Sequence, residues 1–407
     1  MKKTVLKKYA KLIVEKGASV KKGDTVLIYA ELDQPEFVKT VVEEAYKAGA
    51  AKVCVEWNYD PLFKVKIKNE SVRTLCKVDD WEVAKMNWRL ETLPAMIYLV
   101  SEDPDGQRGI NQSKYAKRIT ARMKVLKPIR DKMENKYKWC IAAVPGEAWA
   151  KKVFPGLKKN AAIEKLWESI LFTSRVDDDP VAAWDRHNAD LAARCDHLNS
   201  LGLVSLEYKA SNGTDLKVGL IENANFLGGG EYTLSGEYFN PNIPTEEVFT
   251  SPKAGEAEGI VYSSKPLSYN GELIENFSVR FEGGRAVEVK AEKGEALLKE
   301  MISMDDGAAK LGECALVPQK SPIAESGILF YNTLFDENAA CHLALGVGFS
   351  NCIKDYEKYT LKECQEMGIN DSMIHVDFMI GTDDLEITGV DKKGRRHPIF
   401  KNGNWAF

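Results

Sequence analysis

Histidine is rare in this chain, with five residues in 407, so the setting of each one is informative. His375 and Asp377 lie two residues apart within a run of strand-forming residues, 373–381. Because side chains two apart on a strand point to the same face, the imidazole and the carboxylate would project together. Both groups are ligands for divalent metals such as Zn, Co or Mn. The pair therefore favours a metal site, and a surface ion pair with nothing bound is the alternative interpretation.

Two more polar residues interrupt apolar segments of the same half. His342 begins the run 342–346, where a charged imidazolium would be disfavoured and a neutral ring needs a partner. Glu313 stands inside the apolar run 311–318, and a carboxylate is seldom buried unless it is paired or bound to a metal. A metal ion would satisfy both residues. The alternatives are a hydrogen-bonded core histidine and a glutamate on the outward face of an edge strand.

A pair of adjacent glutamates follows a proline. Pro244 stiffens the chain just before Glu246 and Glu247, and neighbours in an extended segment point opposite ways. Only one of the two glutamates can therefore enter a given site. With the residues above, the second half of the chain supplies two to four carboxylates and two histidines. Two divalent ions about 3.5–4 Å apart require such a carboxylate-rich set, because bridging carboxylates hold the ions together and offset their charge.

Other catalytic patterns are missing from the sequence. It has no GxSxG elbow, GxxxxGK[ST] loop or HExxH helix, and the glycines of 228–230 lack the GxGxxG spacing and predict a turn. Cys341 directly precedes a histidine, but adjacent side chains diverge, which argues against a thiol nucleophile. The remaining histidines are interpreted as structural or solvated: His187, His197 and His397.

Composition and charge exclude several classes of protein. Fifty-six Lys and Arg against 60 Asp and Glu give a net charge of −4, without the basic excess that nucleic-acid binding demands. No stretch approaches the ~18 continuous apolar residues of a spanning helix, and residues 1–17 predict an amphipathic helix rather than a signal peptide. The eight cysteines form no CxxC pair, which indicates reduced thiols. We expect a cytoplasmic protein that binds neither nucleic acid nor membrane.

Two domains must position these residues, since one hydrophobic core stops growing near about 250–300 residues. In the first half, apolar strand-like runs alternate with helical patterns, which predicts a parallel sheet flanked by helices. The strand-like runs are 25–29, 51–57, 95–100 and 139–144, and the helical patterns include 35–48 and 113–132.

A long amphipathic helix over about 180–202 is predicted to bridge the two halves. After it, short strand-like runs alternate with Gly, Asn and Pro turns, which indicates an antiparallel fold. We therefore expect an α/β N-terminal domain with a parallel sheet over 1–180, followed by a β-rich α+β metal-binding domain over 181–407.

Taken together, the motifs resemble those of the aminopeptidase T family, dimetal exopeptidases also described as thermophilic aminopeptidases. The resemblance covers nearly the whole chain. The matching segments, in family order, are 179–184, 197–199, 244–250, 334–346, 375–381 and 398–405. The resemblance implies a homodimeric, metal-dependent hydrolase that removes N-terminal residues from peptides with two divalent ions, which would be Zn, Co, Mn or Mg.

The metal ligands of that family are two Glu, two His, one Asp and one Tyr. Five of these six residue types are present in the matching motifs. By resemblance, the ligands fall on Glu247, Glu313, His342, His375 and Asp377. Glu246 remains an alternative to its neighbour Glu247.

The family Tyr is replaced. Its position, seven residues after the first histidine ligand, is Phe349. A phenyl ring can neither coordinate a metal nor donate a hydrogen bond to a developing oxyanion. Tyr356 and Tyr359 follow shortly, and a shifted loop would be needed to bring either one to the site.

The implied reaction assigns roles to the carboxylates. Glu313, or with less support Glu247, would take a proton from the attacking water and pass it to the leaving amine. Two alternatives remain open. One is a dimetal hydrolase of a non-peptide substrate, because fold and metals do not fix the substrate. The other is a catalytically impaired homologue that acts as a binding dimer, for which Phe349 is the only sequence argument.

Overall fold

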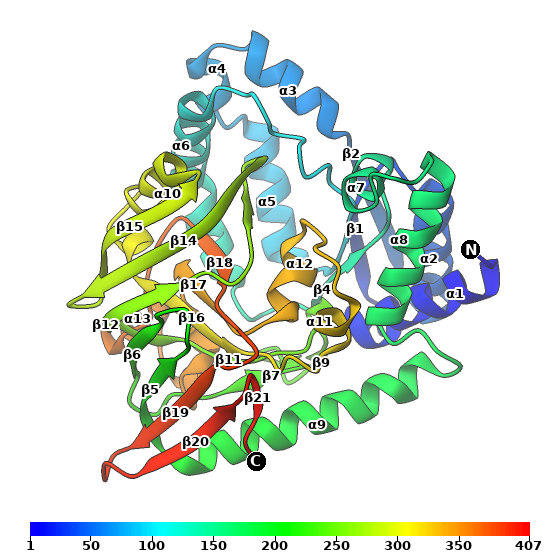
Figure 1. Ribbon diagram of the computed structural model, residues 1–407. Helices are drawn as coiled ribbons and strands as arrows, with labels where there is room; N and C mark the ends of the chain where they lie inside the picture. Colours follow the sequence, from blue (N-terminus) through cyan, green and yellow to red (C-terminus); the bar gives the residue numbers. More distant parts are fainter. The chain divides into compact units, whose positions relative to one another are not determined.

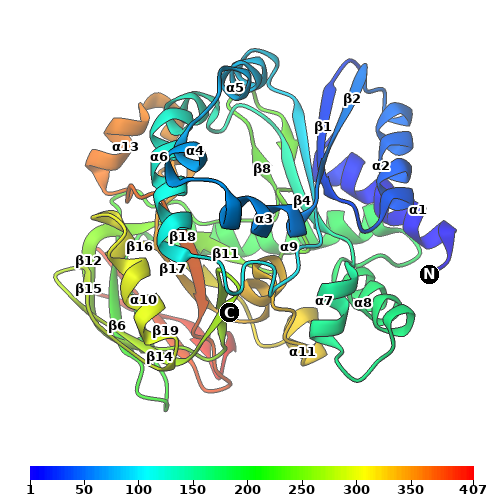
Figure 2. The ribbon, with the colours of Figure 1, turned by 90° about the horizontal axis from the view of Figure 1, so that it is seen from above.

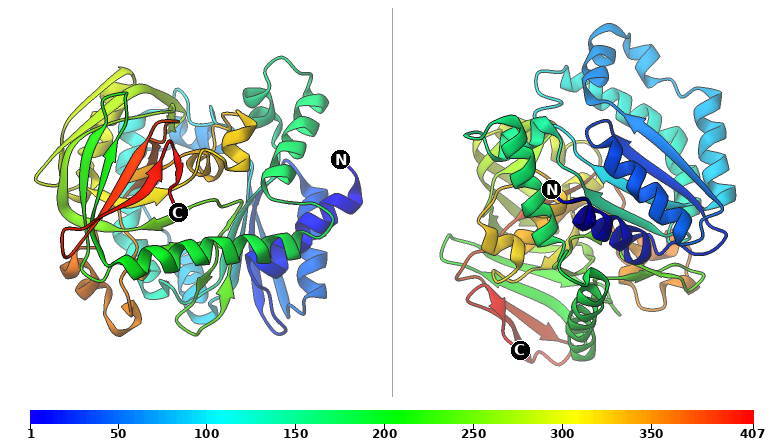
Figure 3. Two further views of the ribbon diagram at one scale, coloured as in Figure 1. Left: turned by 60° about the horizontal axis from the view of Figure 1, so that its bottom comes forward. Right: turned by 90° about the vertical axis from the view of Figure 1, so that its right-hand side faces the viewer.

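The computed structural model describes residues 1–407, and the chain divides into two compact units (Figure 1). Unit 1 comprises Met1–Arg186 and Gly230–Pro244, and unit 2 comprises His187–Gly229 and Thr245–Phe407. The first boundary falls inside α9 (Pro180–Leu201), which Figure 3 shows as one long continuous helix in the range predicted for it.

Unit 1 contains a five-stranded parallel sheet with the strand order β10-β4-β3-β1-β2. Its strands are β1 (Thr25–Glu31), β2 (Lys52–Asn58), β3 (Ala95–Val100), β4 (Trp139–Ala143) and β10 (Asn242–Ile243). Helices α1 and α2 lie on one side of the sheet and α5 lies on the other (Figure 2). Strands covered on both faces are apolar throughout, which is why the sequence showed continuous apolar runs here. The predicted α/β class with a parallel sheet is confirmed.

The helices of unit 1 match the predicted alternation with strands. They are α1 (Lys3–Leu12), α2 (Pro35–Lys47), α3 (Asp60–Asn69), α4 (Val72–Cys76), α5 (Asp80–Thr92), α6 (Gln112–Arg130), α7 (Glu147–Val153) and α8 (Lys159–Thr173). None of the helices in the protein combines the length and the apolar content that crossing a membrane requires.

Segment 230–244 lies within the range predicted for the second domain but belongs to unit 1. It carries the short hairpin β8 (Glu231–Tyr232) and β9 (Tyr238–Phe239), and then β10, which pairs with β4 through Asn242 and Ile243. Strands of two residues leave no periodicity in the sequence, so this return of the chain could not be read from it.

Unit 2 is β-rich, as predicted, and contains two antiparallel sheets. The larger one has the order β13-β14-β12-β6-β5-β19-β20-β21, with β15 paired to β14. Its strands are β5 (Leu203–Lys209), β6 (Asp215–Leu220), β12 (Pro252–Tyr262), β13 (Leu267–Tyr269), β14 (Glu272–Glu282), β15 (Arg285–Lys293), β19 (Glu386–Asp391), β20 (Arg396–Lys401) and β21 (Asn404–Trp405).

The smaller sheet of unit 2 has the order β18-β17-β16-β11-β7, and we call it the site sheet. Its strands are β7 (Leu227–Gly228), β11 (Val248–Thr250), β16 (Leu311–Leu316), β17 (His342–Gly346) and β18 (His375–Met379). The helical elements of this part of the chain include α10 (Glu295–Ile302), α11 (Pro322–Ser326), α12 (Thr333–Asp336), the 3₁₀ helix η4 (Glu337–Ala339) and α13 (Leu361–Met367).

One hydrophobic core joins the two sheets of unit 2. It takes Tyr208 and Phe277 from the larger sheet and Leu343 and Phe378 from the site sheet, all of them buried. The site sheet is therefore fixed by one face, and its opposite face is free to carry polar side chains.

Gly346 allows β17 and β18 to approach each other closely. It has φ +110° and pairs with His375, and a Cβ atom at this position would lie 2.0 Å from the carbonyl oxygen of Ile374. Only glycine satisfies both conditions, because it tolerates positive φ and adds no atom between the strands.

We expect Gly346→Ala to lower the free energy of unfolding by about 3 kcal/mol or more, through backbone strain and overpacking together. Urea denaturation followed by circular dichroism measures the change. The control is Gly394→Ala in the β19–β20 turn, where φ is +76° but no heavy atom lies within 4 Å of the added carbon. This variant should lose only the strain contribution of about 1–2 kcal/mol. Equal losses in the two variants would contradict the packing argument.

Candidate metal centre

Four of the five predicted metal ligands project from one face of the site sheet. Glu313 of β16 lies opposite Ala344 of β17, which in turn lies opposite Asp377 of β18. His342 is two residues before Ala344, and His375 is two residues before Asp377. Residues opposite one another, and residues two apart on a strand, share a face. The antiparallel register therefore brings these side chains together from segments far apart in the sequence.

Small residues make room between the ligands. Ala315 lies opposite His342, Ala344 separates Glu313 from Asp377, and Gly346 lies opposite His375. The residues that alternate with the ligands point to the other face and belong to the hydrophobic core: Cys314, Leu316, Leu343, Leu345, Val376 and Phe378. One face of these strands is therefore apolar and packed, and the other is polar and converging.

The structure separates the two adjacent glutamates. Phe249 of β11 lies opposite Ala315, so alternation places Glu247 on the ligand face and Glu246 on the other side. Glu247 Oε2 lies 3.3 Å from His342 Nε2. Glu246 Oε2 instead lies 3.9 Å from Nε2 of His187 on α9.

The ligand atoms form two groups that share one residue. Glu247, Glu313 and His342 make the first group, and Glu313, His375 and Asp377 make the second. Within each group the candidate ligand atoms all lie within 4.8 Å of one another. His375 Nε2 lies 3.1 Å from Glu313 Oε2 and 3.1 Å from Asp377 Oδ1. Glu313 is the one residue that both groups contain.

Backbone carbonyls orient both histidines. His375 Nδ1 lies 2.8 Å from the carbonyl oxygen of Val347, and His342 Nδ1 lies 3.2 Å from that of Ala340. A ring nitrogen next to a carbonyl oxygen must donate its proton, which leaves Nε2 of the neutral ring as a lone-pair acceptor. Histidines that bind a metal through one ring nitrogen usually donate the proton of the other nitrogen in this way.

The metal-free cluster is electrostatically strained. Burial alone would lower the pKa of His342, but its hydrogen bond to Glu247 and the surrounding carboxylates raise that pKa to about 9. Burial would also lower the pKa of His375, but Asp377 and Glu313 outweigh this effect and raise that pKa well above its usual value. Burial raises the pKa of Glu313, and the charges of Glu247 and Asp377 add to that effect. The carboxylates of the metal-free cluster therefore carry negative charge that the protons of the cluster do not fully neutralise.

One buried oxygen in the cluster has no hydrogen-bond partner. Asp377 Oδ1 accepts none, although it lies 3.1 Å from His375 Nε2, because that contact lacks hydrogen-bond geometry. An unsatisfied buried carboxylate oxygen costs free energy unless a cation or donor meets it. Imidazole nitrogen and carboxylate oxygen are the donor set that divalent first-row metals accept. The residues present therefore fit a divalent metal ion.

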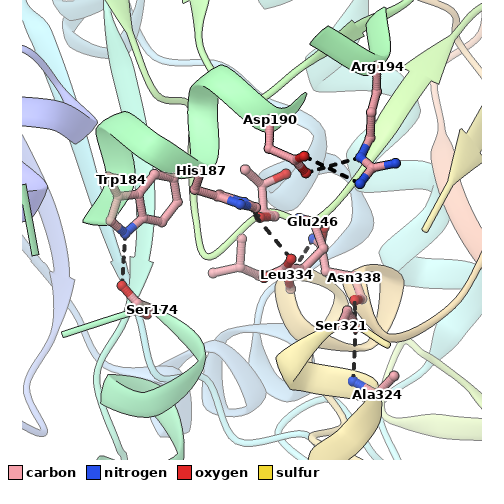
Figure 4. Close-up of polar contacts among 11 residues, drawn as sticks. Ser174, Trp184, His187, Asp190, Arg194, Glu246, Ser321, Ala324, Leu334 and Asn338 are labelled. Carbon is pink, nitrogen blue, oxygen red and sulfur yellow. Dashed lines mark hydrogen bonds and ion pairs between the residues drawn. The ribbon is translucent and has the colours of Figure 1, made fainter. Parts of the chain in front are cut away.

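A hydrogen-bond network fixes the segment that carries Glu247. The carbonyl oxygen of Thr245 lies 2.7 Å from His187 Nε2, and the backbone N–H of Glu246 donates to Asn338 Oδ1 at 2.7 Å (Figure 4). Asn338 Nδ2 donates to the carbonyl of Leu334 at 3.0 Å, which ties the network to α12. His187 therefore has the structural role predicted for it.

Phe349 occupies the position next to His375 where the family resemblance places a tyrosine. Its ring centroid lies 4.9 Å from that of His375 and 5.7 Å from that of Phe249. Neither nearby tyrosine takes its place. Tyr356 packs against the cluster around Ile353 and Cys364, and Tyr359 is exposed.

Glu337 is not among the site residues predicted from the sequence. Burial and the charges of Asp377, Glu247 and Glu313 raise its pKa well above the ordinary value, against the opposing effect of His375, so its carboxyl group interacts electrostatically with these residues. The available signal was the acidic run directly before the strand of His342. That signal was too weak to separate Glu337 from Asp336, whose carboxylate instead accepts backbone N–H groups at 2.8 and 3.0 Å.

The remaining histidines and the cysteine considered as a nucleophile lie in other settings. His197 stacks on Phe407, and His397 pairs with Asp391 at 3.2 Å. The Cys341 thiol donates to the carbonyl of Val317 at 3.3 Å, and burial raises its pKa to about 12. A neutral, buried thiol is unreactive, so the argument against a cysteine nucleophile agrees with the structure.

Comparisons with known proteins assign the chain to a family. The model of the thermophilic metalloprotease family M29 matches residues 2–405. The chain belongs to this family. The resemblance to aminopeptidase T, which rested on separate motifs, is confirmed over the whole chain.

Three M29 relatives are informative. Aminopeptidase AmpS of Bacillus subtilis is 43% identical over 404 residues, with 99% of this chain and 98% of the relative covered. Aminopeptidase 2 of Geobacillus stearothermophilus is 41% identical, with 99% and 98% covered. The structure of wild-type AmpT from Thermus thermophilus has a TM-score of 0.89 and 36% identity, with 100% of both chains covered.

The two adjacent glutamates of this M29 protein offer a matched test of the metal centre. Divalent ions added to chelator-treated protein should raise its Tm, because an ion that binds only the folded state stabilises it. We expect Glu247→Gln to weaken the apparent affinity for the metal ion strongly. Loss of a residue that only supports a ligand typically weakens metal affinity about 10–100-fold, and the loss here should be larger. Thermal denaturation at increasing Mn²⁺, Co²⁺ or Zn²⁺ measures the change.

Glu246→Gln is the control for that experiment, since its side chain faces His187 rather than His342. It should change the apparent metal affinity by less than about tenfold, below the usual effect of an outer-shell residue. If Glu246→Gln weakened the metal affinity more than Glu247→Gln, the alternation argument would have placed the wrong glutamate at the metal centre.

Proposed function

We propose that the protein is a metal-dependent aminopeptidase that removes N-terminal residues from peptides. Two divalent ions, Zn, Co, Mn or Mg, would be held by the side chains of Glu247, Glu313, His342, His375 and Asp377. The arrangement that carries the proposal is the pair of ligand groups that share Glu313. It occurs in a chain of the M29 metalloprotease family whose relatives are named aminopeptidases.

Each ligand group offers oxygen and nitrogen donors, all of them buried except the partly buried His375. When bound, the ions would supply a water-derived nucleophile near neutral pH and polarise the scissile carbonyl. His342 and His375 keep Nε2 as an acceptor because Nδ1 of each faces a backbone carbonyl. Glu247, Glu313, His342 and Asp377 are buried, and electrostatic interactions between buried groups are stronger than those between groups in water.

Glu313 is the best placed proton carrier of the chain. It belongs to both ligand groups, whereas Glu247 belongs to one, and burial raises its pKa toward the range of a general base. A carboxylate oxygen of Glu313 would accept the proton of the attacking water and return it to the amine that leaves. Glu247 is the second choice because its Oε2 lies beside His342.

The setting of the enzyme is part of the proposal. The family resemblance supports a homodimer, and the eight cysteines, none of them in a disulfide, support a reducing compartment such as the cytoplasm. The net charge of −4 supports a peptide substrate rather than nucleic acid.

Glu313→Gln should lower kcat for an aminoacyl p-nitroanilide by about 10²–10⁴-fold, because glutamine cannot accept the proton. Circular dichroism should show an unchanged fold. Steady-state kinetics on the metal-loaded protein measures the loss. Unchanged peptidase activity in this variant would refute the role of Glu313.

A substrate panel separates peptide hydrolysis from other dimetal reactions. The wild-type protein should cleave aminoacyl anilides and short peptides, and it should leave phosphoesters and N-blocked amides intact. Faster turnover of a phosphoester or a simple amide than of any aminoacyl substrate would contradict the proposed function, since fold and metals alone do not fix the substrate.

Phe349→Tyr should raise kcat, by up to about 10²–10³-fold, if the new hydroxyl donates to the developing oxyanion. The ring already faces His375, with 4.9 Å between the ring centroids. The comparison uses kcat of the two proteins at equal metal content. Phe249→Tyr is the control, because that ring packs against Phe349 within the same apolar cluster and should give no such gain. Absence of peptidase activity in wild type and Phe349→Tyr, both with metal bound, would contradict the proposed enzyme.

A further inference from the structure

Asn338 is a buried amide that lies between two segments of the candidate metal centre. It belongs to the 3₁₀ helix η4, and His342, the first residue of β17, follows it four positions later. Its exposed fraction is 0%, so both ends of the amide must find partners inside the protein. The proposed reaction gives this side chain no role, and its hydrogen bonds show what it does.

The oxygen of this amide holds the segment that presents Glu247. Glu247 lies just before β11, whereas the other four candidate ligands lie within paired strands. The backbone N–H of its neighbour Glu246 donates to Asn338 Oδ1 at 2.7 Å. On the other side, the carbonyl oxygen of Thr245 lies 2.7 Å from His187 Nε2. The position of Glu247 therefore depends on side-chain contacts as well as on strand pairing.

The nitrogen of the same amide secures the segment that leads to His342. Asn338 Nδ2 donates to the carbonyl oxygen of Leu334 at 3.0 Å, within the turn that precedes β17 (Figure 4). Two residues after Asn338, the carbonyl oxygen of Ala340 lies 3.2 Å from His342 Nδ1 and orients that ring. One side chain thus connects the backbone that presents Glu247 with the backbone that orients His342.

The two side chains connected in this way meet closely. Glu247 Oε2 lies 3.3 Å from His342 Nε2, and both residues belong to the first ligand group, with Glu313 as its third member. The second group takes its other two members from β18, and the Asn338 amide makes no hydrogen bond to that strand. The contacts of the amide therefore favour an effect on the first group.

We propose that Asn338 is a positioning residue that sets the spacing of Glu247 and His342 for one of the two metal ions, an inference that rests on the proposed function. A carboxamide suits this role, because it offers an acceptor and a donor in fixed geometry and adds no charge beside the ligands. Residues that hold ligands in place typically change metal affinity about 10–100-fold when they are lost. The ion held by the first group should depend on Asn338, and the ion held by the second group should depend on it much less.

Asn338→Ala tests the inference through metal uptake. Chelator-treated protein is titrated with Mn²⁺ in a calorimeter, and its metal content is measured after dialysis at a free Mn²⁺ concentration that loads the wild type with two ions. We expect one ion to bind about 10- to 100-fold more weakly and the other to change much less, so that the dialysed variant keeps about one ion per chain. Equal weakening of both ions, or of neither, would overturn the inference.

Asn199→Ala is the matched control. Asn199 Oδ1 accepts the backbone N–H of Phe226 at 2.7 Å, and its Nδ2 donates to the carbonyl of Phe226 at 3.1 Å, so this variant also loses one accepted and one donated hydrogen bond. Phe226 precedes β7, the edge strand of the site sheet that carries no candidate ligand. Both variants should lower the Tm of the metal-free protein, but Asn199→Ala should change metal affinity by less than about tenfold. A similar fall in metal affinity in both variants would show that lost stability, and not positioning, is the cause.

A double-mutant cycle asks whether Asn338 acts through Glu247. In the Glu247→Gln background, Asn338→Ala should weaken the affected ion little further, because the ligand that it positions is already lost. In an Asp377→Asn background, it should keep its full effect. Additive losses with Glu247→Gln would overturn the inference.

Asn338→Asp is a milder variant, which serves if Asn338→Ala does not fold. It keeps an oxygen that can accept from the backbone N–H of Glu246, and it loses the donor to Leu334. The weakening should again be confined to one ion. Weakening of both ions, or of neither, would count against the inference here as well.

Failure of the inference and failure of the proposed function give different results, because the metal measurements need no turnover. A wild-type protein that holds two ions and cleaves no aminoacyl anilide would refute the proposed peptidase. The comparison of Asn338→Ala with Asn199→Ala would then still decide the role of Asn338. A wild-type protein that cleaves aminoacyl anilides with a single bound ion would overturn the inference and leave the peptidase intact.

Discussion

The alternation of side chains along β16, β17 and β18 is the constraint on which the metal centre depends. One set of alternate residues, including Leu343 and Phe378, enters the core that joins the two sheets of unit 2. The other set carries the ligands, such as Glu313 and Asp377, on the opposite face. A shift of one residue in either pairing would exchange the two faces, and it would bury carboxylates in the core while exposing leucines. Core packing and ligand geometry are therefore specified by the same register.

The polar face is an arrangement that needs a cation. Glu247, Glu313, His342 and Asp377 are buried, and His375 is partly buried. Burial lowers the pKa of His342, but its hydrogen bond to Glu247 and the surrounding carboxylates raise that pKa to about 9. Asp377 Oδ1 lacks a hydrogen bond. Burying several carboxylates together is unfavourable unless positive charge compensates them. The free energy gained from core packing and strand pairing therefore has to offset this cost. Carbonyls behind both histidines show that the second layer of contacts is also in place.

Loops and short helical turns complete what the strands begin. Glu247 precedes β11, η4 carries Glu337, and Phe349 follows β17. Of these positions, that of Phe349 tolerates variation better than the paired strands, because it lies outside the strand ladder. Substrate preference and the supply of hydrogen-bond donors to the reaction are therefore expected to be set by these connecting segments, on a strand framework that holds the metal ligands.

Local patterns were enough to predict the parallel α/β first half, the β-rich second half, the helix over 180–201 and the His375–Asp377 pair, because periodicity and residue type act locally. The packing of distant segments fixed two further features: β10 returns to unit 1, and Glu247 rather than Glu246 faces His342. Those outcomes depend on pairing between residues distant along the chain, and on which side of a turn a side chain leaves the backbone. A local pattern cannot encode either, since both are fixed only when the strands pack together.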